Sequence, residues 1–80
     1  MRIQVRLYAS LQRFMPGERA SSSFHDMEVD EGTTVGEFLD VLHVPADTVK
    51  LIFLNGIHAQ ADQIMKDGDR LGVFPPVAGG

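Results

Sequence analysis

One stretch of the chain carries the apolar spacing of an amphipathic helix. Its side chains recur at intervals of three and four residues and so form a single stripe. The stripe consists of Val35, Phe38, Leu39 and Leu42. Thr34 with Glu37 three residues later is a capping box, which satisfies two backbone donors at the helix start, and Pro45 ends the helix. Because no comparable stripe occurs elsewhere, this one helix has to cover whatever sheet the rest of the chain forms.

The remaining apolar residues mostly alternate with polar ones, which is the period of a β-strand with one buried face. Asn55-Gly56 separates two of the runs and favours a type I′ hairpin turn, because both residues tolerate a positive φ. Residues 9–14 are compatible with a short helical turn, and residues 17–23 with a loop. The expected strands span residues 1–8, 24–29, 49–54, 57–59 and 70–74. The first two are expected to pair antiparallel.

The order strand, strand, helix, strand, strand, strand predicts an α+β fold, with a mixed sheet of about five strands packed on one main helix. A chain of 80 residues has room for one domain. We expect a folded domain over residues 1–74 and a flexible C-terminal tail over residues 75–80. Ile64 and Met65 are expected to turn back toward the core. The other expected core residues are Ile3, Val5, Leu7, Leu39, Leu42, Leu71 and Val73.

Composition and charge weigh against several classes of function. Seven basic and eleven acidic residues give a net charge of −4, so a nucleic-acid partner is not expected. The chain has no cysteine, which excludes disulfides, thiolate metal sites and cysteine nucleophiles. Residues 1–8 resemble neither a signal peptide nor a membrane span, so we expect no membrane association and a cytoplasmic location.

The chain shows no pattern of an autonomous active site. His25, His43 and His58 fall on different expected elements without metal-ligand spacing, and no glycine-rich phosphate loop is present. The Asp67-Gly68-Asp69 segment is more typical of a turn than of a calcium loop. We therefore expect this chain to bind no cofactor, and to act as a co-substrate or small subunit of a larger enzyme if it takes part in catalysis.

The C-terminal residues have a design that a frayed end would not need. Pro75 and Pro76 remove backbone donors, so the strand ending at Phe74 cannot continue. Six residues from Pro75 onward reach about 19 Å in extended geometry, enough to enter another protein's active site. Gly79 and Gly80 have no Cβ, so a narrow channel can hold the backbone. The terminal carboxylate is then the candidate reactive group.

The ending Phe74-Pro75-Pro76-Val77-Ala78-Gly79-Gly80, together with Asp67-Gly68-Asp69, closely resembles the molybdopterin synthase small subunit, within the family of ubiquitin-like sulfur carriers. The resemblance implies the ubiquitin-like β-grasp fold. It also implies that an E1-like enzyme uses ATP to adenylate Gly80 and that a sulfur donor protein then converts the adenylate to a thiocarboxylate. A larger synthase subunit would receive the tail, with Gly79 giving room to enter, and sulfur would pass to a pterin precursor.

Strand parity indicates where partners dock. If Val5, Leu7 and Val73 face the helix, the aromatic residues next to them face the other side of the sheet. An aromatic cluster beside the tail would be a natural recognition patch. The predicted partner-binding residues are Tyr8, Phe53, His58, Phe74, Pro75, Pro76 and Val77.

Three other functions remain open at this stage. The chain could carry sulfur for the thiazole of thiamine, a pathway whose carriers belong to the same family. It could be a ubiquitin-like modifier, joined to target lysines through Gly80. It could also be an interaction module with an inert tail.

Overall fold

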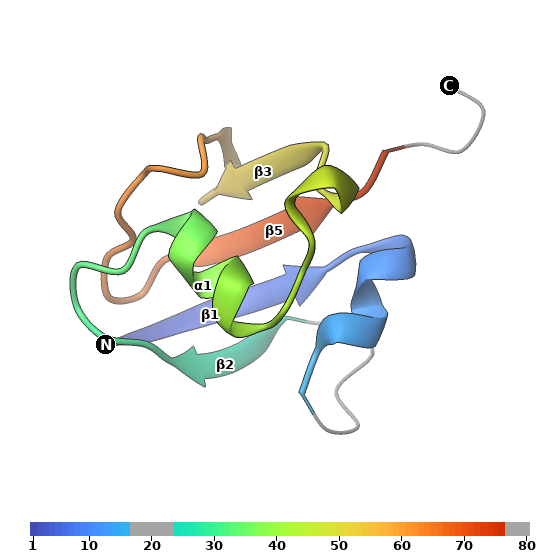
Figure 1. The fold of residues 1–80 in the computed structure, drawn as a ribbon. Coiled ribbons are helices and arrows are strands. Elements are labelled where there is room, and N and C mark those ends of the chain that lie inside the picture. Colours follow the sequence, from blue (N-terminus) through green and yellow to red (C-terminus); the bar gives the residue numbers. More distant parts are fainter. Residues whose placement is uncertain (17–23, 77–80) are drawn as a thin grey trace.

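The computed structural model describes residues 1–16 and 24–76 (Figure 1). Its elements lie close to the predicted ranges. In chain order they are β1 (Arg2–Leu7), the 3-10 helix η1 (Ala9–Phe14), β2 (His25–Glu28), α1 (Val35–Val41), the 3-10 helix η2 (Ala46–Thr48), β3 (Leu51–Leu54), β4 (Ile57–His58) and β5 (Arg70–Phe74). The third strand starts two residues later than predicted, because η2 and the turn after it precede it.

The five strands form one mixed sheet in the order β2-β1-β5-β3-β4. The two central strands, β1 and β5, run parallel, whereas the other neighbouring pairs are antiparallel. In Figure 1, α1 crosses one face of this sheet over β1 and β5. The predicted α+β class, the mixed sheet and the antiparallel pairing of β1 with β2 are confirmed.

Helix α1 begins as the sequence predicts. The backbone N–H of Glu37 donates to Oγ1 of Thr34 over 3.1 Å, and the N–H of Thr34 donates to Oε1 of Glu37 over 2.9 Å. The helix has only seven residues, too few to be stable alone in water. Packing against the sheet therefore supplies most of its stability.

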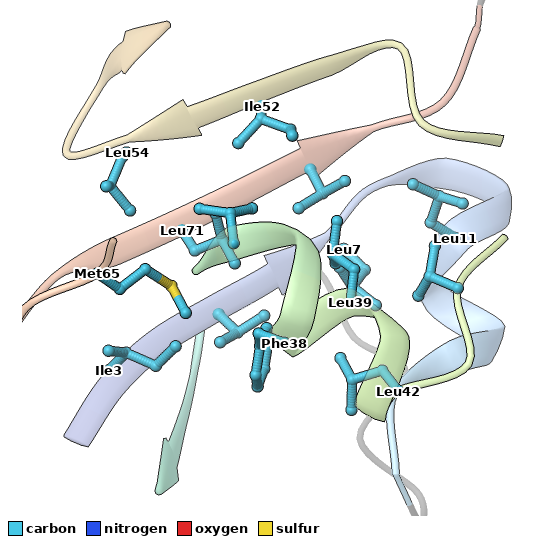
Figure 2. Close-up of a cluster of buried hydrophobic side chains, with 14 of the residues drawn as sticks. Ile3, Leu7, Leu11, Phe38, Leu39, Leu42, Ile52, Leu54, Met65 and Leu71 are labelled. Atoms are coloured by element: carbon cyan, nitrogen blue, oxygen red, sulfur yellow. The ribbon is translucent and has the colours of Figure 1, made fainter. Parts of the chain in front are cut away.

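The core lies between α1 and the sheet (Figure 2). All seven residues first expected there are buried, and Met65 joins them at 1% exposure. Leu11 of η1 and Val44, which follows α1, also belong to the core. Ile64 was expected in the core but is 55% exposed. It forms an antiparallel bridge with Thr34, and neighbouring residues in extended backbone point to opposite sides, so only Met65 can point inward.

The β3–β4 turn is fastened to the start of β5. Asn55 and Gly56 have φ angles of 55° and 80°, as the predicted turn requires. The backbone N–H of Arg70 donates to Oδ1 of Asn55, and Nδ2 of Asn55 donates to Oδ1 of Asp69, each over 2.9 Å. These bonds fix Arg70 at the edge of the sheet face that α1 does not cover.

Candidate functional site

The sheet has two faces of different chemistry. Side chains on the α1 face are apolar and buried, as in Val5 and Leu71. Their neighbours along the same strands point to the opposite face, which we call the open face. On the open face Tyr8, Phe53 and Phe74 are only half-buried, so they remain available to another molecule.

Four rings form a continuous row across the open face. Tyr8 stacks on Phe74, with ring centroids 3.9 Å apart and planes at 13°. Phe53 meets Phe74 edge to face at 5.7 Å, and His58 meets Phe53 in the same manner at 5.9 Å. The structure thus brings together four of the predicted partner-binding residues, from β1's end to β4. Their role in binding stays a prediction.

Gly72 makes room for the Tyr8 ring in this row. A Cβ at this position would lie 3.3 Å from Cε2 of Tyr8 and 3.8 Å from Cε1 of Phe74, so the Tyr8 ring lies against the glycine backbone. The open face has a hollow of about 610 Å³ here. The residues that line it are Gln4, Tyr8, Phe24, Phe53, Asn55, Gly56, Gly68, Arg70, Gly72 and Phe74.

Guanidinium groups flank the aromatic residues. The Arg6 guanidinium carbon lies 4.1 Å from the Tyr8 ring centroid, and that of Arg70 lies 4.9 Å from the Phe24 centroid. Nε of Arg70 also donates to Oε1 of Gln4 over 3.1 Å. An arginine stacked on an aromatic ring is held in place while its planar edge stays free to donate hydrogen bonds. The open face therefore carries the guanidinium groups of Arg6 and Arg70 beside its aromatic rings.

Sequence reasoning did not single out Arg6, Arg70, Gly72 or Phe24. The signal was available, because the parity that placed Tyr8 and Phe74 on the open face also places Arg6, Arg70 and Gly72 there. The hollow itself depends on how the rings of Tyr8 and Phe74 turn, which no pattern in the sequence gives.

The stem of the tail starts directly after Phe74, which lies between Tyr8 and Phe53 in the aromatic row. The backbone N–H of Lys50 donates to the carbonyl of Phe74 over 2.8 Å, the last ladder bond before Pro75. Pro75 is half-buried and Pro76 is exposed. The predicted residues Val77, Gly79 and Gly80 lie outside the described residues, so the expectations about them remain predictions.

Within residues 1–16 and 24–76, no three His, Asp or Glu side chains are grouped to hold a metal ion. None of the helices in the same ranges combines the length and apolarity needed to cross a bilayer.

A family model described as Mut7-C ubiquitin matches residues 1–79. The chain belongs to the Mut7-C ubiquitin family. The resemblance to ubiquitin-like proteins, which the ending from Asp67 to Gly80 indicated, is thereby confirmed. Among curated proteins, no relative matches this Mut7-C ubiquitin chain.

The solved structures similar to this chain include two groups with informative descriptions. SAMP1 from Haloferax volcanii matches with 25% identity and a TM-score of 0.70 over 100% of both chains. A second Haloferax volcanii structure, described as small archaeal modifier protein 1, has 26% identity and a TM-score of 0.69, with 95% of this chain and 98% of that chain covered.

The other group carries molybdopterin names. A candidate molybdopterin converting factor subunit 1 from Pyrococcus furiosus has 24% identity and a TM-score of 0.68, covering 95% of this chain and 98% of that one. A chain in the complex of subunits 1 and 2 of the Helicobacter pylori molybdopterin-converting factor has 20% identity and a TM-score of 0.60 over 100% of both chains. At these identities the second group shows the fold alone. The ubiquitin-like β-grasp fold is confirmed by both groups.

Proposed function

We propose that this Mut7-C ubiquitin is a sulfur carrier for the synthesis of molybdopterin or a related pterin cofactor. The Gly80 carboxylate attacks the α-phosphate of ATP in an E1-like enzyme, which forms an acyl-adenylate and releases pyrophosphate. Hydrosulfide delivered by a sulfur donor protein attacks the acyl carbon, AMP leaves, and the chain ends in a thiocarboxylate. The ATP belongs to the partner enzyme, and no cofactor is assigned to this chain.

The observation that carries the proposal is the continuity between the aromatic row and the tail stem. Phe74 stacks on Tyr8, and Pro75 and Pro76 follow it directly. A partner that docks on the row is therefore next to the point where the stem leaves the sheet. Because Pro75 and Pro76 restrict the backbone, docking would also limit the directions in which the terminal glycines can be presented. A larger synthase subunit could use the same row at the transfer step.

The direct test is the intact mass of the purified chain. It is first measured alone, to establish that the mature chain ends at Gly80. It is then measured after incubation with the E1-like enzyme, ATP and sulfide. The proposal expects a mass gain equal to exchange of one oxygen for one sulfur, absent without ATP and absent in a chain lacking Gly80. An unchanged mass under complete conditions would reject it.

The match to small archaeal modifier protein 1, at 26% identity, favours one second candidate. In that case the activated Gly80 carbonyl would pass to a lysine amine of a target protein, releasing AMP and forming an isopeptide bond. Covalent adducts in an extract supplied with ATP, lost when Gly80 is deleted, would favour the modifier over the carrier. A thiocarboxylate without adducts would favour the carrier, and adding a pterin or a thiazole precursor then identifies the acceptor. If removing Gly79 and Gly80 changed neither thiocarboxylation nor adduct formation nor partner binding, the chain would be an interaction module with an inert tail.

A further inference from the structure

Strand β2 forms one edge of the sheet (Figure 1). The N–H of Val29 donates to the Met1 carbonyl over 2.9 Å, and the Met1 amine donates to the Val29 carbonyl over 2.8 Å, so these two residues form a hydrogen-bonded pair. In an antiparallel ladder such pairs alternate with pairs whose backbone groups point away from the partner strand. By the register of β1 with β2, the outward-pointing residues of β2 are Asp26 and Glu28.

The outward backbone groups of β2 can pair with another strand. Among the described residues, none bonds to the backbone N–H or C=O of Asp26 or Glu28. Proteins commonly bind extended segments by adding them as a strand to such an edge. Antiparallel pairing is the more stable arrangement per residue. In this arrangement one residue of the segment exchanges two hydrogen bonds with Asp26, and the residue two positions away does the same with Glu28.

An apolar groove of about 240 Å³ lies between β2 and α1, beside this edge. Its apolar lining consists of Met27, Val29, Phe38, Val41 and Leu42. Val41 is 72% exposed, whereas Phe38 in the same helix is buried. Residues opposite each other on neighbouring strands point to the same face, so a segment residue opposite Met27 would point into the groove. The groove therefore suits an apolar side chain of an added strand.

Acidic residues along this edge select the charge of the added strand. Glu28 and Asp30 line the groove, and none of its described lining residues is basic. Asp26 is exposed and has no ion-pair partner within residues 1–16 and 24–76, whereas Glu28 is paired with Arg2 at 3.2 Å. A residue opposite Asp26 has its Cβ about 5 Å away on the same face, where opposite charges attract and like charges repel. A second copy of β2 would place acids opposite acids.

We propose that the outer edge of β2 binds an extended segment of another protein as an additional antiparallel strand. The segment has a basic residue opposite Asp26 and an apolar neighbour that enters the groove beside α1. Because β1 separates β2 from β5, this site is distinct from the aromatic row and from the stem of the tail. The inference therefore does not rest on the proposed function.

The test uses the full chain and blocked heptapeptides, with affinities from NMR titration. Ser-Val-Lys-Val-Lys-Val-Ser has the required alternation, and its controls replace either both lysines by glutamates or all valines by serines. The lysine peptide should bind at least about fivefold tighter than either control. At saturation, hydrogen exchange of the Asp26 and Glu28 amides should slow at least about tenfold. The Met27 amide, which already bonds to β1, is the internal reference.

N-methylation separates strand addition from simple charge attraction. In the antiparallel arrangement the lysine N–H groups point toward β2, and the N–H of the central valine points away. A peptide N-methylated at one lysine should therefore bind at least about fivefold more weakly than the parent peptide. A peptide N-methylated at the central valine should lose less than about twofold.

Two pairs of variants at exposed positions locate the site on the chain. Asp26→Asn should reduce the preference for the lysine over the glutamate peptide at least about twofold. Asp47→Asn, an equal change of charge on η2, should leave it unchanged. Val41→Ser should weaken the lysine peptide about threefold, whereas Ile57→Ser, equally exposed but on β4 at the other edge of the sheet, should not. Thermal unfolding establishes that each variant is folded.

Four outcomes would overturn the proposal. These are no binding of the lysine peptide up to its solubility limit, equal affinity for the lysine and glutamate forms, equal losses from the two N-methylated peptides, and unchanged exchange at Asp26 and Glu28 on saturation. Self-association through β2 that excludes the peptide would assign the edge to a second copy instead, and would also reject it. None of these results bears on whether Gly80 is thiocarboxylated.

Discussion

The ring of Tyr8 stacks on the ring of Phe74 at a centroid distance of 3.9 Å. Tyr8 directly follows β1, and Phe74 is the last residue of β5, the strand parallel to it. The backbone N–H of Tyr8 donates to the carbonyl of Val73 over 3.0 Å, so backbone and side chains join the two strand ends at the same point. The end of β5, from which Pro75 and Pro76 continue, is therefore held to the end of β1 by both backbone and side-chain contacts.

Removing Phe74 should weaken docking to the activating enzyme. Phe74→Ala deletes the ring that joins Tyr8 to Phe53, and buried aromatic anchors often contribute more than 1 kcal/mol to an interface. We expect the KM for the carrier in ATP-pyrophosphate exchange to rise at least about fivefold. Ile57→Ala is the control, because Ile57 is 72% exposed and pairs with Leu54, away from the aromatic row. Equal KM values for the two variants would contradict the docking role.

Leu39 is expected to be one of the largest single contributors to stability. It is 5% exposed in α1, so Leu39→Ala should lower the free energy of unfolding in urea by about 2 to 5 kcal/mol. Val41, in the same helix, is 72% exposed, and Val41→Ala should change it by less than about 0.5 kcal/mol. Similar losses for both would show that the α1 stripe does not face the sheet as described.

Two substitutions at Asn55 separate backbone strain from side-chain bonding. Asn55→Ala loses the hydrogen bonds to Arg70 and Asp69 and puts an alanine at a φ of 55°, which should cost about 2 to 3 kcal/mol. Asn55→Gly loses the same bonds but tolerates the φ, so its cost should be about 1 kcal/mol smaller. Urea unfolding of both variants measures the difference. Equal costs would show that the positive φ is not a source of strain.

The capping box of α1 provides a further stability test. Thr34→Ala removes the oxygen that accepts the Glu37 N–H and should cost about 1 kcal/mol. Thr34→Ser keeps a hydroxyl at the same position and should cost only a few tenths of that. If urea unfolding gives the two variants the same stability, the hydroxyl bond is not what starts the helix.

Local patterns predicted most of the fold. The spacing of Thr34 and Glu37 located the start of α1, and strand parity sorted Val5 from Tyr8 and Val73 from Phe74 onto opposite faces. Such patterns succeed because they follow from backbone geometry over a few residues. The prediction for Ile64 was wrong because such patterns cover only a few residues. The direction of Ile64 is set by a bridge to Thr34, thirty positions away in the chain.

The candidate site was predictable only in outline. Parity could collect Tyr8, Phe53, His58 and Phe74 on one face, but ring orientation comes from packing. Among the described residues, Nε of Arg6 has no hydrogen-bond partner, whereas Arg2 donates to Glu28 on the neighbouring strand. The register between β1 and β2 decides this pairing, and it brings together residues that are far apart in the chain.

The central claim is that the reacting group is the carboxylate of Gly80, and locating the sulfur tests it most directly. After reaction with the E1-like enzyme, ATP and sulfide, cleavage following Arg70 releases a peptide spanning residues 71–80, which tandem mass spectrometry can read from its C-terminal end. The account predicts that the oxygen-for-sulfur exchange lies in the fragment containing Gly80 and nowhere else in the chain. Sulfur on any other residue, or an unmodified peptide from a chain that the enzyme has adenylated, would contradict it.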